Sequence, residues 1–169
     1  MKFPIVFLSY NPFVEPEETL AMRLHTLGGV NGFQMLLPDR FQGNHHITPE
    51  TQRRINLADY FVLFSTKPQQ SPVVLEEISY AWERWHDKRR ILIIYDNTTG
   101  KNLSGADNCT EIFIDSRNES MSSIAAKVQE KLHELHTTPA GTQHKASPLE
   151  RILLAGLGIW LLDRLITEH

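Results

Sequence analysis

Apolar residues in the first 136 positions form short continuous runs that alternate with segments of helical periodicity. The strand-length runs are "PIVFLS" (4–9), "FQMLLP" (33–38), "DYFVLFST" (59–66), "RRILIIYD" (89–96) and "CTEIFIDS" (109–116). The helical segments are "EPEETLAMRLHTLGG" (15–29), "TPETQRRINLA" (48–58), "VVLEEISYAWERWHD" (73–87) and "SSIAAKVQEKLHELH" (122–136). Strands without polar alternation are typical of parallel sheets covered on both faces. The pattern predicts an α/β protein with a central five-stranded parallel sheet and helices on both faces.

The ends of these segments indicate where a site would lie. Thr48 is placed as an N-cap and Pro49 as the first helical residue, a strong helix start. In parallel α/β sheets, ligands bind beyond the carboxyl ends of the strands. The segments at that edge are "SYNPF" (9–13), "PDRFQGNHH" (38–46) and "STKPQQS" (65–71).

The composition changes after residue 136, which sets the expected domain boundary. Residues 1–136 form the predicted domain, 137–148 read as a linker, and 149–169 as an extra C-terminal apolar helix. The apolar core of that helix spans only 152–162, well short of the roughly 20 residues that cross a bilayer. Packing on its own domain, an oligomer contact and shallow membrane association remain alternatives, and the short span counts against the last.

Net charge and cysteine content exclude several classes of protein and of binding site. Seventeen Lys and Arg against twenty Asp and Glu give a net charge of -3, which argues against a nucleic-acid partner. Cys109 is the only cysteine, so no internal disulfide forms, and with no signal-like N-terminus we expect a cytoplasmic protein. The adjacent His45 and His46 cannot easily share one ion, and no further ligands stand at metal spacing, so no metal site is expected.

Two adjacent glutamates, Glu76 and Glu77, interrupt an apolar helical segment. Helical periodicity divides this segment into three stripes. A core stripe holds Val74, Ile78, Ala81 and Trp85, a solvent stripe Glu76, Ser79, Glu83 and Asp87, and a border stripe Val73, Glu77, Tyr80 and Arg84. Glu76 is therefore expected to be a surface acid. Glu77 is either a partly desolvated functional carboxylate or an ordinary acid favoured by the helix dipole.

Three segments, in this order, resemble the Toll/interleukin-1 receptor (TIR) domain of the bacterial and plant-like type. "IVFLSY" (5–10) resembles the first box, and residues 32–65 resemble the second strand, the BB loop, its helix and the third strand. The landmarks of the second segment are Gly43, Ile47, Ile55 and Ser65. "SPVVLEEISYAW" (71–82) resembles the segment Ser-X-Trp-X-X-X-Glu-[Leu/Ile]-X-X-Ala. The likeness covers residues 3 to about 136 and implies a flavodoxin-like TIR fold.

The resemblance implies that Glu77 is the glutamate with which catalytic TIR domains cleave the nicotinamide–ribose bond of NAD⁺, a substrate and not a bound cofactor. Loss of nicotinamide gives the ribose oxocarbenium character, which one carboxylate can stabilise. The product is nicotinamide with ADP-ribose, a cyclic isomer or a conjugate. One departure concerns placement of the substrate, since the usual aromatic four residues earlier is Val73.

The other candidate substrate-binding residues surround Glu77 in the predicted fold. Ser9, Tyr10 and Asn11 end the first strand, and a plain turn is the alternative reading for them. Asp39 and Arg40 either pair with each other or contact phosphate. Val73 and Tyr80 share the stripe of Glu77 and complete the set.

The resemblance also implies partners and a setting. TIR domains often become active on assembly, with the BB loop of one copy completing the site of the next, so a homo-oligomer is expected. Signal production in bacterial anti-phage defence, read by a separate effector protein, is the first hypothesis. The second is a non-enzymatic TIR–TIR interaction module. A third is an enzyme like the nucleoside deoxyribosyltransferases, which share the sheet topology and a catalytic glutamate.

Overall fold

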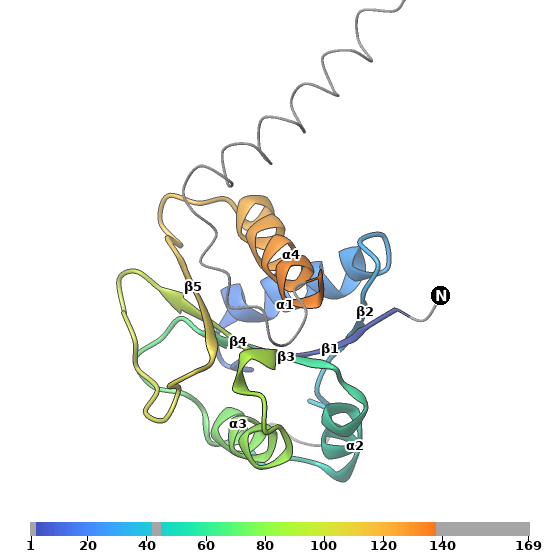
Figure 1. The fold of residues 1–169 in the computed structure, drawn as a ribbon. Helices are drawn as coiled ribbons and strands as arrows, with labels where there is room; N and C mark the ends of the chain where they lie inside the picture. Colours follow the sequence, from blue (N-terminus) through green and yellow to red (C-terminus); the bar gives the residue numbers. More distant parts are fainter. Residues whose placement is uncertain (1–2, 42–44, 138–169) are drawn as a thin grey trace, which may run out of the picture. The chain divides into compact units, whose positions relative to one another are not determined.

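The computed structural model of the chain describes residues 3–41 and 45–137 (Figure 1). Strands and helices alternate as β1 (Ile5–Ser9), α1 (Glu15–Gly28), β2 (Gln34–Leu36), α2 (Pro49–Leu57), β3 (Tyr60–Ser65), α3 (Pro72–Arg84), β4 (Ile91–Asp96), β5 (Thr110–Ile114) and α4 (Met121–Thr137). A 3-10 turn, Lys88–Arg90, precedes β4. The expected alternation of strands and helices is confirmed.

The five strands form one parallel sheet in the order β2-β1-β3-β4-β5. This order is consistent with a flavodoxin-like fold, and the predicted five-stranded α/β architecture is confirmed. The register aligns Ser9 with Leu63 and Ser65 with Tyr95, so the carboxyl ends of the strands meet at one edge. Side chains that follow these strands are therefore brought together.

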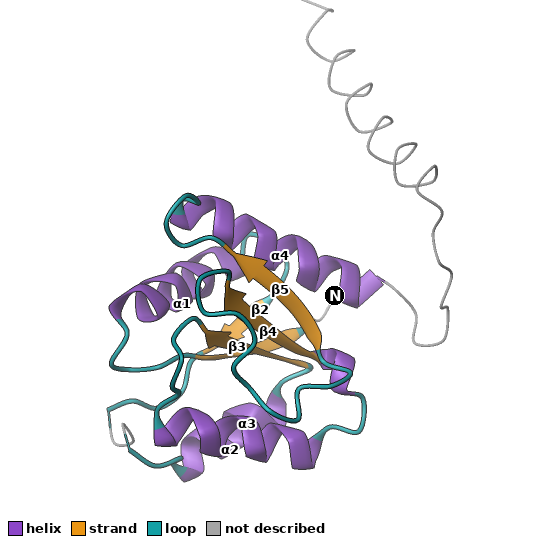
Figure 2. Ribbon diagram, turned by 90° about the vertical axis from the view of Figure 1, so that its left-hand side faces the viewer, coloured by secondary structure: helices purple, strands orange, loops and turns teal. Residues whose placement is uncertain are grey.

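The helices cover both faces of the sheet. α1 and α4 pack side by side on one face, and α2 and α3 on the other (Figures 1 and 2). Alternate residues of each strand serve opposite faces: Val62 and Phe64 contact the α1–α4 layer, whereas Phe61 and Leu63 contact the α2–α3 layer. This two-sided burial explains why the strands are continuously apolar.

Residues in or next to the first turn of a helix favour its start at that place. Thr48 caps α2 by accepting a hydrogen bond from the backbone N–H of Thr51 at 3.1 Å, as its sequence position predicts. α1, α2 and α3 each carry a proline in the first turn. α3 ends at Arg84, earlier than the sequence pattern indicated, because Trp85 leaves the helical conformation while remaining buried in the core.

Some sequence predictions fall outside the described residues. They are the linker 137–148 beyond its first residue, the C-terminal helix 149–169 and the landmark Gly43. The chain divides into two units, Met1–His136 and Thr137–His169, and the sheet with its helices belongs to the first. None of the helices within 3–41 and 45–137 has the length and apolar character needed to cross a membrane.

Candidate active site

Glu77 lies in the N-terminal half of α3 with a fully buried side chain, 0% exposed. The hydroxyl of Ser9, the last residue of β1, donates a hydrogen bond to its Oε2 at 2.6 Å. Arg40 binds both carboxylate oxygens: Nη1 contacts Oε1, and Nη2 lies 3.0 Å from Oε2. Glu77 belongs to the border stripe of the helix, and its side chain points into the interior. Its carboxylate lies against the carboxyl end of β1.

Arg40 covers the carboxylate of Glu77. Its side chain is 11% exposed, and its Nη2 also donates to the backbone carbonyl of Tyr10 at 2.8 Å. The guanidinium carbon lies 5.2 Å from the centre of the Tyr10 ring, within range of a cation–π contact. Its Nε is buried without a hydrogen-bond partner in the described part of the chain. In this conformation the paired Glu77 carboxylate has no exposed surface.

Burial sets the electrostatics of the cluster. Burial raises the pKa of the Glu77 carboxyl above its ordinary value, and the hydrogen bonds and charge of Arg40, then the Ser9 hydroxyl, oppose that rise. Burial likewise raises the pKa of Tyr10, against the charge of Arg40. The charge state of Glu77 therefore depends on where the guanidinium of Arg40 sits.

The structure adds a second buried acid that the sequence reading missed, Glu17 of α1, 1% exposed. Its Oε2 accepts from the backbone N–H of Asn11 at 2.9 Å. Its Oε1 accepts from the N–H of Thr66 at 3.0 Å and from the Thr66 hydroxyl at 2.6 Å. Glu17 thereby joins the segments that follow β1 and β3. A signal was present, because Glu17 shares the helical stripe of Leu20, Ala21, Leu24 and Gly28, which are all buried.

Glu76 has a more specific role than a surface acid. Its side chain is 38% exposed, and it accepts a hydrogen bond from the backbone N–H of Ile47 at 2.8 Å. His46 lies 2.9 Å away through Nδ1. The backbone hydrogen bond of Ile47, then His46, lowers the pKa of Glu76. Glu76 holds the end of the segment between β2 and α2, whereas Glu77 binds its beginning through Arg40.

The predicted site residues fall into two groups. Ser9, Tyr10 and Arg40 contact Glu77 or one another, and Asn11 joins them through its peptide group. The remaining predicted residues are Asp39, Val73 and Tyr80.

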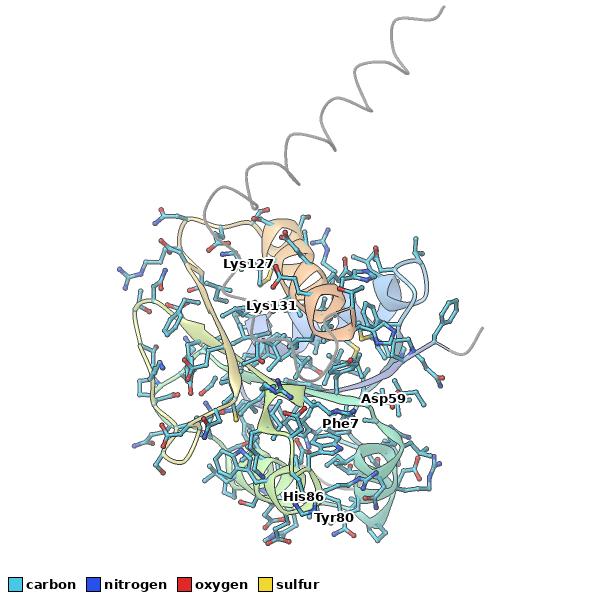
Figure 3. All side chains as sticks on the ribbon, viewed as in Figure 1. Phe7, Asp59, Tyr80, His86, Lys127 and Lys131 are labelled. Atoms are coloured by element: carbon cyan, nitrogen blue, oxygen red, sulfur yellow. The ribbon has the colours of Figure 1, made fainter. Side chains whose placement is uncertain are left out.

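Those three residues serve other contacts. The backbone N–H of Asp39 donates to the Thr51 hydroxyl at 2.9 Å, beside α2. Val73 is fully buried in the α2–α3 core. Tyr80 lies on α3 on the opposite side of the sheet from Lys127 of α4 (Figure 3), and its hydroxyl accepts from Asn56 at 2.8 Å. Their part in substrate binding stays a prediction.

The arrangement supplies one carboxylate, one hydroxyl and one guanidinium around a shared point. Such a set can hold a sugar hydroxyl, stabilise developing positive charge and bind a phosphate. Among the described residues, no group of three or more His, Cys, Asp or Glu side chains is arranged to hold a metal ion.

Comparison with models of known protein families and with curated proteins gives no match for this chain.

Proposed function

We propose that the chain is a TIR-type NAD⁺ glycohydrolase or cyclase with Glu77 as its catalytic carboxylate. The observation that carries the proposal is the buried Glu77 carboxylate held between the Ser9 hydroxyl and the Arg40 guanidinium at the carboxyl end of β1. This is the edge at which parallel α/β proteins bind ligands. The motif resemblance selects the same residue.

The reaction requires Arg40 to leave the carboxylate first. A ribose cannot contact an acid whose two oxygens face Ser9 and Arg40 and whose side chain is 0% exposed. When Arg40 turns outward, its guanidinium becomes free to bind the NAD⁺ pyrophosphate, a pairing that suits its planar geometry. Ser9 remains behind Glu77 and fixes the orientation of the carboxylate.

The chemistry then needs one acid. The bond between ribose C1′ and the nicotinamide nitrogen breaks, and its electron pair leaves with nicotinamide as a neutral ring. Glu77 stabilises the oxocarbenium character left on the ribose. A water oxygen attacks C1′ and loses a proton to give ADP-ribose, or an adenine nitrogen attacks to give a cyclic isomer.

We place this activity in the cytoplasm and in a homo-oligomer. The product of the reaction signals to a separate defence effector.

A second candidate function is a non-enzymatic interaction module. The observation that favours it is the completeness of the ion pair, since a buried Arg–Glu pair with hydrogen bonds on both oxygens is also a common structural device. Val73, which replaces the usual aromatic of the motif, is part of the core. On this reading, Glu77 only joins α3 to β1.

Nicotinamide release separates the two functions. The purified full chain is incubated at high concentration with NAD⁺, beside Glu77→Gln and the matched control Glu83→Gln, an exposed glutamate of the same helix. We expect Glu77→Gln to lower release by about a hundredfold or more, because the amide cannot stabilise positive charge. Glu83→Gln is expected to retain the wild-type rate.

Circular dichroism shows whether Glu77→Gln still folds. Release that persists in folded Glu77→Gln would reject the catalytic assignment. If the wild-type chain releases no nicotinamide even after forced assembly, the result would support the non-enzymatic interaction module. The second product, ADP-ribose or a cyclic isomer, identifies whether water or an adenine nitrogen attacks the ribose.

A further inference from the structure

A separate cavity of about 370 Å³ opens at the carboxyl ends of β3, β4 and β5. Its lining includes residues from the first turns of α1 and α4. These two helices share one face of the sheet (Figure 2). Glu77 belongs to α3, which covers the other face, and neither Glu77 nor Arg40 is among the residues that line this cavity. Its volume falls within the range of small-molecule sites, and its position is one where open α/β sheets bind ligands.

The floor and the walls of the cavity differ in chemistry. The apolar lining residues, here called the floor, include Leu20, Phe64, Ile114, Met121 and Ile124, and the polar ones are called the walls. The walls carry carboxylates from Glu17, Asp96 and Glu119 beside the hydroxyls of Thr66, Thr98 and Thr99, with Lys67 as the one cation among the described lining residues. An apolar floor under acceptor-rich walls suits a flat ring that carries hydrogen-bond donors.

The carboxylates are held in place, which makes the walls a formed surface. Burial opposes ionisation of Asp96, but hydrogen bonds from Ser116 and Thr98 outweigh it and lower the pKa. Its Oδ1 accepts from the Thr98 N–H at 2.8 Å. Lys127 pairs with Glu119, and burial raises the pKa of Glu17. Asp96 is therefore the lining carboxylate whose negative charge is held by neutral donors, and that charge disfavours a phosphate beside it.

One peptide group connects this cavity to the Glu77 cluster. Glu17 Oε2 accepts from the N–H of Asn11, while Arg40 Nη2 donates to the C=O of Tyr10, and both belong to the Tyr10–Asn11 peptide. A ligand that engages Glu17 therefore changes the environment of the peptide to which Arg40 is bound. The amide of Asn11 is a direct reporter of that change.

We propose that this cavity is a second ligand site, distinct from the Glu77 cluster, for an uncharged nucleoside or a compound of the same chemistry. The heterocycle lies on the apolar floor, and the amino and hydroxyl donors face the carboxylate and threonine walls. The site does not depend on cleavage of NAD⁺. Phosphorylated forms of the same ligand are disfavoured by the Asp96 carboxylate.

Adenosine titrated into the ¹⁵N-labelled full chain tests the proposal, with AMP as the matched charged probe. We expect adenosine to shift the amides of Asn11, Thr66 and Thr98 in a saturable manner. Those amides donate to the buried carboxylates Glu17 and Asp96. AMP is expected to bind about tenfold more weakly or worse, because its phosphate meets the Asp96 carboxylate, which carries a charge of the same sign.

Two variants of α4 locate the binding. Met121→Trp narrows the cavity and is expected to abolish the adenosine shifts, whereas Ala126→Trp, at an exposed position outside the lining, is expected to keep them. The amide spectrum of each variant reports whether it folds. Absence of saturable shifts in the wild-type chain would overturn the proposal. So would equal binding of AMP, or retention of binding in folded Met121→Trp.

Discussion

Two glutamates are buried at the carboxyl edge of the sheet, Glu17 from α1 on one face and Glu77 from α3 on the other. Burial raises the pKa of both carboxyls. Their partners differ. Glu17 accepts hydrogen bonds from two backbone N–H groups and one hydroxyl, all neutral. Glu77 accepts from one hydroxyl and from a charged guanidinium at the end of a long side chain.

This difference determines what each acid can do. Backbone donors move only when the backbone moves, so Glu17 is a fixed link between the segments after β1 and β3. The guanidinium of Arg40 ends a long side chain, and the proposed function requires it to leave the carboxylate by rotation of that side chain. Both acids are buried, so burial alone does not identify a functional acid, and the two differ in the kind of group that binds them.

The largest expected effect comes from removing the charged partner. Arg40→Met leaves the Glu77 carboxylate buried without a cation, and we expect the free energy of unfolding to fall by about 3–5 kcal/mol near neutral pH. Urea denaturation measures this loss. The loss should shrink in acid, where Glu77 takes up a proton and no longer needs the guanidinium.

A matched surface variant and a double variant control this prediction. Arg53→Met removes an exposed arginine paired with Glu50 on α2 and is expected to leave stability nearly unchanged. Arg40→Met combined with Glu77→Leu removes both charges and should recover most of the lost stability. If the double variant is as unstable as Arg40→Met, the loss arises from packing of the arginine stem and not from an uncompensated charge.

An intermediate effect is expected from deleting one hydroxyl at each acid. Ser9→Ala and Thr66→Val each remove a hydrogen bond of 2.6 Å to a buried carboxyl. We expect each variant to lose about 1.5–3 kcal/mol of unfolding free energy. Under the proposed function, Ser9→Ala also lowers the rate of nicotinamide release, whereas Thr66→Val leaves it within a few-fold. Equal effects on release would contradict the contrast between the two acids.

The fold was predictable because its signals are local. Continuous apolar runs such as "RRILIIYD" require a sheet covered on both faces, and Thr48 with Pro49 marks a helix start without reference to the rest of the chain. Boundaries were less certain, as at Trp85, because a buried residue satisfies the helical pattern even after the helix has ended. Strand order follows from packing between distant segments, which a single sequence expresses weakly.

The site was predictable only in part. The helical stripes located Glu77 at the edge of the core, but periodicity contains no information that Arg40, 37 positions away in the sequence, covers it. Glu17 was overlooked because an acid in the first turn of a helix is usually favoured by the dipole alone. Its place on the stripe of Leu20 and Leu24 was visible in the sequence, and the same argument that selected Glu77 applies to it.

The smallest effect concerns pH and tests whether Glu17 behaves as a buried acid among neutral donors. Because burial raises its pKa above the ordinary 4.5, the folded chain holds the proton more tightly than the unfolded chain. This contribution to stability is fully present below about 4.5 and is lost as the pH rises through the folded-state pKa. Glu17→Gln cannot titrate. The stability of the wild-type chain relative to Glu17→Gln should therefore fall with rising pH, by up to about 1.4 kcal/mol per pH unit within that window.

Urea denaturation of both proteins across the weakly acidic range measures the difference, and subtraction cancels the acids whose pKa is lowered, such as Glu76 and Glu119. A difference that grows with rising pH would mean that Asn11 and Thr66 outweigh burial and hold Glu17 ionised. Glu17 would then carry a charge without a cation beside it. Both acids would then be ionised, and they would differ in the kind of donor that holds them: backbone N–H groups for Glu17 and a side-chain guanidinium for Glu77.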